Sequence, residues 1–553
     1  MSDATWPRVL PMGERALLAE VATLGDVLAL RAALAASAPD GVVDIVPAAR
    51  TVLVQVDPRV LPLAAARAWI ARIARGRTDA GGTVAAAAPV VLDMAYDGPD
   101  LADAAAALGV SAEALAARHE AAAWTVAFAG FAPGFAYLTS DEWPFDVPRL
   151  DSPRTRVPAG SVGLAGEFTG AYPRETPGGW RLIGTTAAPL FDPAAASPAL
   201  LEPGAAVRFR RVARVIRAAP GEAPAGPDET PTAPAGVPAG PDTVTPARTA
   251  APTPAPGLRV IEPVLLATIQ DLGRTGRASQ GIARSGALDR GALRTANRLV
   301  GNAEGAAGIE VTLGGFRAVT GTDTWVAVTG AWGGIRIDGH AVDPYVAHAW
   351  PAGTELHIDW FAHGVRAYLA VRGGIDGLVV AGSRATDTLS KLGPAPLAAG
   401  DDVGVRADAG GPVPVGDLAP WGAPPDDEVV VELEPGPRAD WFAASALATL
   451  FETAWVVTNA ADRVGVRLEG SPLERAVAGE VPSEGMVPGA IQVPPSGLPT
   501  VLLADGPVTG GYPVIAVVAD DSLDAFAQLR PGTRIRFRHA HHTHAHASAH
   551  ASV

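Results

Sequence analysis

The chain has 553 residues, 48% of them hydrophobic and 18% charged, with a formal net charge of −15 at pH 7. This length allows several domains, and the negative charge argues against a nucleic-acid partner or an anionic membrane. Cysteine is absent, which excludes disulfides, thiolate metal sites and a cysteine nucleophile.

Lysine is nearly absent as well. Lys391 is the only lysine among 43 lysines and arginines, so a phosphate-binding loop that ends in Gly-Lys-Ser/Thr is excluded. Lys391 lies between serine and leucine rather than between methionines, and we expect no covalently bound biotin on this chain. The sequence has neither a secretion signal nor an apolar stretch of bilayer length, so we expect a cytoplasmic protein.

Residues 1–88 predict a small α+β domain, with strands at 16–21 and 51–56 and helices at 26–36 and 62–73. No catalytic constellation is expected in it. The next domain, 89–218, begins with a strand and two short helices, and Ser111 caps the second helix. That helix ends near His119, which is either a capping or surface group, or else a general base or a hydrogen-bond donor to a developing charge.

An aromatic stretch follows at 128–138, where aromatic and small residues alternate. Pro133 and Gly134 predict a tight turn within it. Aromatic rings around such a turn either pack in a core or form the wall of a pocket for a flat, mostly apolar ligand. Further on, Arg154 and Arg156 share one face of a predicted strand, where they bind a carboxylate or phosphate or simply face solvent.

Many short strands with Gly/Pro turns predict a β-barrel here. Residues 219–256 are rich in proline and alanine and predict a linker, which leaves 257–538 as a second globular half. Asp289 lies at the start of a helix in that half, where it caps the helix or takes part in chemistry.

Residues 201–210 and 529–538 share the pattern Leu-x-Pro-Gly-x-x-aliphatic-Arg-Phe-Arg, which indicates related barrels in the two halves. Residues 539–553 predict a disordered His-rich tail that binds metal or is dispensable.

These motifs carry a resemblance to a known family. The first half, residues 12–210, resembles the B subunit of 5-oxoprolinase, also called allophanate hydrolase subunit 1 or the kinase-inhibitor protein family. Residues 258–538 resemble the C subunit, the allophanate hydrolase subunit 2 family. The motifs are 12–18, His119, 131–138, 153–161 and 177–184 in the first half, and 270–276, 285–289, 296–302, 370–375, 382–387, 483–494 and 509–513 in the second.

The resemblance implies a mainly β fold with some α+β content, in which cyclophilin-like barrels occur in both halves after the small N-terminal domain. It implies ATP-dependent opening of 5-oxoproline, a cyclic amide, to glutamate by fused B and C subunits. These would act with a separate A subunit, of the lactam-utilisation protein family. Both halves are also similar to the carboxyltransferase part of urea carboxylase, where they enclose one active site. ATP, with or without Mg²⁺, is the implied cofactor, and the sequence locates no site for it; a homo-oligomer is left open.

Motif position and residue chemistry together assign the site. His119 and Asp289 are predicted to transfer protons, and Arg154, Arg156 and Arg274 to bind the anion. No metal site is predicted. The predicted wall of the substrate pocket consists of Phe131, Phe135, Tyr172 and Tyr512.

Three positions depart from the family pattern and leave the exact substrate open: Phe168, Gly506 and Val514 stand where relatives carry glutamine, arginine and lysine. Two other functions also stay open. One is a biotin-dependent carboxyltransferase acting on urea or a similar amide, with the biotin carrier supplied by another chain. The other is a regulatory inhibitor of a sensor kinase.

Overall fold

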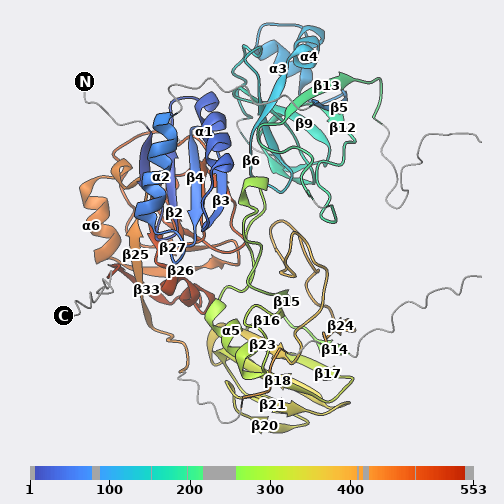
Figure 1. The fold of residues 1–553 in the computed structure, drawn as a ribbon, viewed down its shortest axis with the longest axis vertical. Helices are drawn as coiled ribbons and strands as arrows, with labels where there is room; N and C mark the ends of the chain where they lie inside the picture. The colour runs from blue at the N-terminus through green and yellow to red at the C-terminus, as the bar shows by residue number, and fades with distance from the viewer. Residues whose placement is uncertain are drawn as a thin grey trace, which may run out of the picture.

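The computed structural model describes residues 7–76, 88–215 and 257–541, apart from 151, 153, 196, 408–409, 415–421 and 480. These residues form an N-terminal α+β unit, a first closed barrel, a two-sheet unit and a second closed barrel (Figure 1). The predicted mainly β fold, with a barrel in each half, is confirmed. The second half contains two units, the two-sheet unit and the second barrel. The predicted linker and residues 542–553 of the predicted tail lie outside the described residues.

The N-terminal unit is a four-stranded sheet with two helices on one face. Its elements are β1 (Arg8–Pro11), β2 (Ala16–Glu20), α1 (Leu24–Ala36), β3 (Val42–Pro47), β4 (Thr51–Val56) and α2 (Leu63–Gly76), with strand order β1-β2-β4-β3. Thr23 and Asp26 form a capping box at the start of α1. The helices cover one face of the sheet, and the other face carries Leu18 and Leu53, which pack against the second barrel. The first unit of the chain therefore packs on the last one.

The first barrel follows the predicted pattern of short strands. Ser111 caps the second helix, accepting a hydrogen bond from the Ala114 N–H at 3.1 Å, which confirms that prediction. A two-stranded ribbon, β8 with β11, lies beside the barrel. The elements are β5 (Val90–Ala95), α3 (Leu101–Ala107), α4 (Ala112–Ala121), β6 (Trp124–Ala129), β7 (Ala136–Thr139), β8 (Arg154–Val157), β9 (Ser161–Ala165), β10 (Phe168–Ala171), β11 (Thr176–Gly178), β12 (Arg181–Thr186) and β13 (Ala206–Arg211).

The two-sheet unit packs a six-stranded sheet and a five-stranded sheet around one apolar core. The strand orders are β20-β19-β22-β17-β14-β24 and β15-β16-β23-β18-β21. Helix α5 packs on β18 and β23. The elements are β14 (Gly257–Glu262), β15 (Leu266–Gln270), η2 (Ala278–Gln280), α5 (Arg290–Leu299), β16 (Gly308–Thr312), β17 (Phe316–Thr320), β18 (Thr324–Trp332), β19 (Ile335–Ile337), β20 (His340–Val342), β21 (His348–Trp350), β22 (Glu355–Ile358), β23 (His363–Val371) and β24 (Asp402–Gly404).

The second barrel also carries a ribbon, β28 with β31, at its side. The N-terminal unit lies against this barrel, at the opposite side of the molecule from β14 and β24 (Figure 1). The elements are β25 (Glu428–Pro435), η3 (Ala439–Trp441), α6 (Ala444–Glu452), β26 (Ala454–Ala461), β27 (Gly465–Glu469), β28 (Glu484–Gly485), β29 (Ala490–Gln492), β30 (Thr500–Leu502), β31 (Thr509–Gly510), β32 (Val514–Val518), α7 (Asp520–Leu523), η4 (Asp524–Ala527) and β33 (Arg534–His539).

The two barrels have the same topology. Read from the first strand of each, the orders are β5-β12-β9-β10-β7-β6-β13 and β25-β32-β29-β30-β27-β26-β33. In both barrels the last strand pairs in parallel with the first. Those last strands lie in the two copies of the repeated sequence pattern, so the prediction of related barrels is confirmed.

An ion pair recurs in both barrels with its charges exchanged. In the first barrel, Asp100 follows the first strand and binds Arg154 of the ribbon, Oδ1 to Nη2, at 2.6 Å. In the second barrel, Arg438 occupies the matching place and binds Glu484 of its ribbon, Nε to Oε1, at 2.9 Å. Both residues donate their backbone N–H to the strand that neighbours the first one in the barrel order. Each ribbon is thus fixed to its barrel by the same contact with opposite polarity.

No helix within the described ranges has the length and apolar character needed to cross a membrane.

Candidate functional site

A cavity of about 340 Å³ lies where the N-terminal unit, the two-sheet unit and the second barrel meet. Its walls come from both halves of the chain. The first half contributes 12–15, 43–44, 55–57 and Arg59. The second half contributes residues between 274 and 294 and between 486 and 523. Many of these residues are apolar, among them Met12, Ile282, Met486, Leu503 and Val517.

Close contact between the halves forms one side of the cavity. Gly13 has φ +68°, and a Cβ on it would lie 2.9 Å from the Val517 side chain, so a larger residue would push the halves apart. Two residues later, Arg15 reaches across to Asp520, Nη2 to Oδ2, at 2.6 Å. The Asp520 N–H donates in turn to the Glu14 carboxylate at 2.9 Å. This contact joins residues about 500 positions apart.

A second contact closes the cavity near β3. The Asp44 carboxylate accepts a hydrogen bond from the Ala278 N–H at 2.6 Å and one from the Ser279 N–H at 3.3 Å. Burial raises the pKa of Asp44 above its usual value, although these hydrogen bonds oppose the shift. The N-terminal unit is therefore bound to the second half on two sides of the cavity.

Six arginines and four acidic residues line the cavity, and most of the arginines have a carboxylate partner. Arg290 binds Asp520 at 2.9 Å and Asp524 at 2.8 Å. Arg59 binds Asp57 at 2.8 Å, on the exposed side. Arginines with such partners are neutralised locally and offer little attraction to a ligand.

Arg284 differs from these arginines. Among the described residues, no carboxylate lies within ion-pair distance of its guanidinium group, and its Nε donates to the Leu272 carbonyl at 3.4 Å. Burial lowers the pKa of Arg284 to about 10, with the neighbouring Arg290 adding to the effect. The side chain is still protonated at neutral pH. It therefore places an uncompensated positive charge at the cavity.

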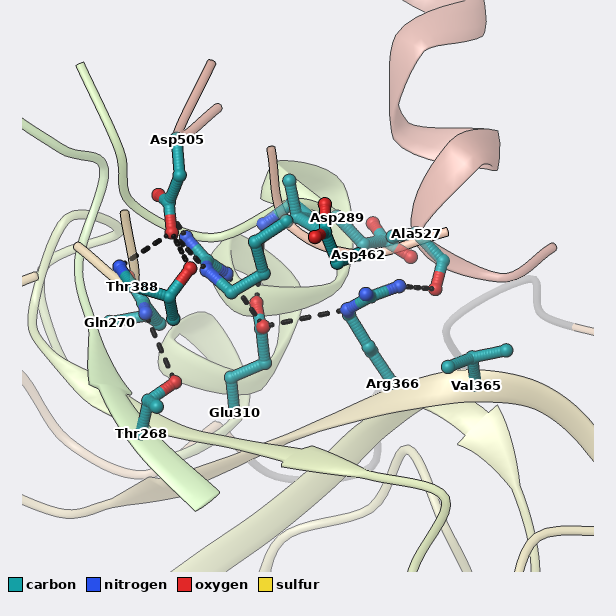
Figure 2. A network of polar contacts seen from close by, with 12 residues as sticks. Thr268, Gln270, Asp289, Glu310, Val365, Arg366, Thr388, Asp462, Asp505 and Ala527 are labelled. Atoms are coloured by element: carbon teal, nitrogen blue, oxygen red, sulfur yellow. Dashed lines mark hydrogen bonds and ion pairs between the residues drawn. The ribbon is translucent and has the colours of Figure 1, made fainter. Parts of the chain in front are cut away.

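The loop that carries Arg284 is fixed by a buried ion network. Figure 2 shows two members of this network, Glu310 and Asp505. Arg463 binds Glu310, Nη1 to Oε1, at 2.6 Å and Asp505, Nε to Oδ2, at 3.0 Å, and all three side chains are at most 1% exposed. Ser285, directly after Arg284, donates its hydroxyl to Asp505 at 2.6 Å. Burial opposes the charge on Asp505, but Arg463 holds its pKa below the usual range.

This network keeps Ser285 in an unfavourable conformation. Ser285 has φ +53°, a region that costs a non-glycine residue about 1–3 kcal/mol. The Arg463 guanidinium also donates to the Gly286 carbonyl at 2.6 Å, and the Arg284 carbonyl accepts from the Arg274 N–H at 2.7 Å. The backbone on both sides of Arg284 is therefore held in one position.

His119, a predicted catalytic residue, lies in the core of the first barrel. It is fully buried, with Nδ1 2.9 Å from the Tyr96 hydroxyl and Nε2 2.9 Å from the Thr169 hydroxyl. Its ring packs against Trp124 and Phe209. Burial lowers the pKa of His119 to about 3, so the ring is neutral. It does not line the cavity.

Asp289, the other predicted catalytic residue, caps helix α5. Its Oδ1 accepts from the Ala292 N–H at 2.8 Å, and its Oδ2 accepts from Gln528 at 2.9 Å. Burial and the nearby Asp524 raise its pKa to about 6. Asp289 does not line the cavity either. His119 and Asp289 thus make interior contacts in two different units, and their role in proton transfer stays a prediction.

Of the three predicted anion-binding arginines, only Arg274 lines the cavity. Its Nε donates to the Val380 carbonyl at 3.1 Å, and its Nη1 is buried without a hydrogen-bond partner. Arg154 is the ribbon residue that pairs with Asp100. Arg156 is exposed and binds Glu175 at 2.6 Å. Arg154 and Arg156 therefore lie away from the cavity, although both are on strand β8.

Two of the four residues of the predicted aromatic wall lie in a small core. Phe135 and Tyr172 are each 1% exposed and pack with Trp180 beside the first barrel. Phe131 and Tyr512 are both 42% exposed. None of the four predicted wall residues lines the cavity. The aromatic turn still meets the second barrel, because a Cβ on Gly130 would collide with Thr509.

Sequence reasoning missed most of the polar residues at the cavity, including all of those from the N-terminal unit. A signal existed for three of them: Glu14 and Arg15 lie in the family motif at 12–18, and Arg284 directly precedes the motif at 285–289. The charged residues missed are Glu14, Arg15, Asp44, Asp57, Arg59, Arg284, Arg290, Arg294 and Asp520.

Comparison with known proteins relates both halves of the chain to known protein families. Residues 7–201 match the model for the carboxyltransferase domain, subdomain C and D, and residues 280–539 match subdomain A and B. The 5-oxoprolinase C subunit of Escherichia coli (strain K12) is 35% identical over 292 residues, which cover 51% of this chain and 90% of that protein. The chain belongs to the family of 5-oxoprolinase B and C subunits.

Further relatives agree with this family. The 5-oxoprolinase B subunit of Escherichia coli O157:H7 is 51% identical over 121 residues, 22% of this chain and 55% of that protein. Urea amidolyase of Lachancea kluyveri is 31% identical over 305 residues, 50% of this chain but 16% of that longer protein. The solved structure of TTHA0988 is 35% identical with a TM-score of 0.78, covering 95% of this chain and 99% of that one. The fused arrangement of the family's two components is therefore supported.

Proposed function

We propose that this chain is the fused B and C component of a cytoplasmic 5-oxoprolinase, which opens 5-oxoproline to glutamate with ATP and a separate A subunit. The observation that carries the proposal is the cavity closed by both halves, with the uncompensated charge of Arg284 at its wall. The relatives named as 5-oxoprolinase B and C subunits support the same reaction.

The chemistry of the cavity suits this substrate. 5-Oxoproline is a small ring with one carboxylate, and pockets for small molecules are mostly apolar with a few placed polar groups, over a range of about 300–1,000 Å³. The cavity of about 340 Å³ lies at the small end of that range. A cavity shared between two halves explains why both components would be needed for one reaction.

The cavity does not fit a nucleoside triphosphate. Four acidic residues line it, most of its arginines already have carboxylate partners, and Lys391 is not among its walls. We therefore assign ATP and any accompanying Mg²⁺ to the A subunit, and no step at this cavity is derived through them.

The test is reconstitution. The purified chain, the A subunit, ATP and 5-oxoproline should together release glutamate, and omission of either protein should abolish the release. A complete mixture that forms no glutamate, with both proteins folded, would refute the proposal.

The match to urea amidolyase favours one second candidate, a biotin-dependent carboxyltransferase. In that case the chain would transfer a carboxyl group only when a biotinylated carrier protein is added. Carrier-dependent carboxylation of urea, without glutamate formation in the first assay, would select this alternative.

A further inference from the structure

Among the described residues that line the cavity, Arg274 and Arg284 both lack a carboxylate within ion-pair distance, but Arg274 has the charges of Asp387, Asp271 and Asp505 nearby, whereas the neighbours of Arg284 are mainly cationic. Arg15, Arg290 and Arg294 line the same cavity and repel the charge of Arg284, and Asp520 attracts it. That carboxylate is already shared between Arg15 and Arg290. An anion placed beside Arg284 would therefore relieve repulsion as well as form charged hydrogen bonds.

Several hydrogen bonds and ion pairs fix the backbone position of Arg284. The buried network of Arg463, Glu310 and Asp505 holds the backbone after it, and the Arg274 N–H binds its carbonyl. These contacts fix the backbone from which the Arg284 side chain reaches the cavity, and a guanidinium group on a fixed backbone has less freedom to lose when it binds a carboxylate. A side chain whose only role was to cover apolar surface would not need such support.

The remaining walls define the class of ligand. Around the charge lie apolar side chains such as Ile282, Met486 and Leu503. The acidic residues of the wall disfavour a ligand with several negative charges, because Glu14 and Asp57 would repel it. The ligand that suits this cavity is a small monocarboxylate with a ring or a short apolar body.

We propose that Arg284 binds the carboxylate of the ligand in this cavity, and that it makes the site selective for small cyclic monocarboxylates over their neutral amides. The choice of 5-oxoproline as the first probe rests on the proposed function. The selectivity itself follows from the cavity alone.

The experiment is calorimetric titration of the full chain with 5-oxoproline and with its neutral carboxamide. The parent should bind the acid about ten- to hundredfold more tightly than the amide, the size expected for charged hydrogen bonds. Arg284→Met should reduce the affinity for the acid to that for the amide and leave the amide unchanged. Arg284→Lys should keep part of the preference.

Arg298→Met is the matched control. Arg298 lies on α5, is 59% exposed, pairs with Glu304 at 3.0 Å and does not line the cavity. This variant should bind both ligands like the parent. Equal binding of the acid by the parent and by folded Arg284→Met would overturn the proposal, as would equal binding of acid and amide by the parent.

A second ligand pair separates this proposal from the proposed function. Cyclopentanecarboxylate and its amide resemble 5-oxoproline and its amide in size and shape but have no lactam group. If reconstitution yields no glutamate but the parent prefers cyclopentanecarboxylate and Arg284→Met does not, the 5-oxoprolinase function fails and the role of Arg284 stands. If neither acid binds the parent at millimolar concentration, the role of Arg284 is refuted.

Discussion

Replacement of His119 tests whether this residue stabilises the first barrel or performs proton transfer. Burial lowers the pKa of His119 from 6.5 to about 3, so the folded chain keeps the ring neutral while the unfolded chain binds a proton below pH 6.5. The stability contributed by the neutral ring is thus complete above pH 6.5 and is lost as the pH falls toward 3. Between pH 7.5 and pH 5 the loss should be about 2 kcal/mol, at 1.36 kcal/mol for each pH unit below 6.5.

The variant His119→Gln cannot titrate in this range. It should be less stable than the parent at pH 7.5, because a packed ring is lost, but its stability should change about 2 kcal/mol less between pH 7.5 and pH 5. Hydrogen exchange of peptides from β6 and β13, in urea, reports the unfolding of this barrel. His340→Gln, at an exposed position on β20, should keep the slope of the parent.

An unchanged slope in His119→Gln would refute the reasoning, since the ring would then be titrating normally in the fold. Activity supplies a second readout. If His119 only supports the barrel, the reconstituted His119→Gln enzyme should keep its turnover at pH 7.5; complete loss of turnover in a folded variant would restore the role predicted from the sequence.

Three further predictions address the other contacts. Arg463→Met should lower the free energy of unfolding by about 3–5 kcal/mol, because two buried carboxylates lose their partner, whereas Arg467→Met, at an exposed position on β27, should change it little in urea titrations. Asp289→Asn should keep the helix cap, because asparagine caps as well as aspartate. The raised pKa of Asp289, about 6, means that the parent loses folding stability as the pH rises from 4 to 6. The variant should lack that loss, which is on the order of 1 kcal/mol for this half-buried group. Gly13→Ala should weaken 5-oxoproline binding in calorimetry, while Gly109→Ala, with the same φ of +68° but no atom within 4 Å of a new Cβ, should not; equal effects would show that backbone strain matters rather than the contact between the halves.

Local patterns in the sequence predicted the elements well. The strand at 51–56 was predicted with the bounds that β4 has, and the caps at Ser111 and Asp289 were both anticipated. These features depend on neighbours within four residues, so periodicity and side-chain chemistry are sufficient to predict them.

The cavity depends on contacts that no local pattern encodes. Arg15 meets Asp520 only because the N-terminal sheet packs on the last barrel. Arg284 lacks an ion-pair partner because Arg15 and Arg290 already bind Asp520, and Arg290 also binds Asp524. For the aromatic stretch the sequence left two readings open, packing in a core or forming a pocket wall. Phe135 packs with neighbours beside its own barrel, which is the more common fate of such residues.

The exchanged ion pair has a consequence for how the chain folds. A chain with two copies of one architecture is exposed to misassembly, in which a segment of one copy inserts into the other. If the two ribbons traded places, Arg154 would face Arg438 and Glu484 would face Asp100, and both encounters would bring like charges together away from bulk water. The opposite polarity of the two ion pairs therefore disfavours the exchange of ribbons and favours the pairing of each ribbon with its own barrel.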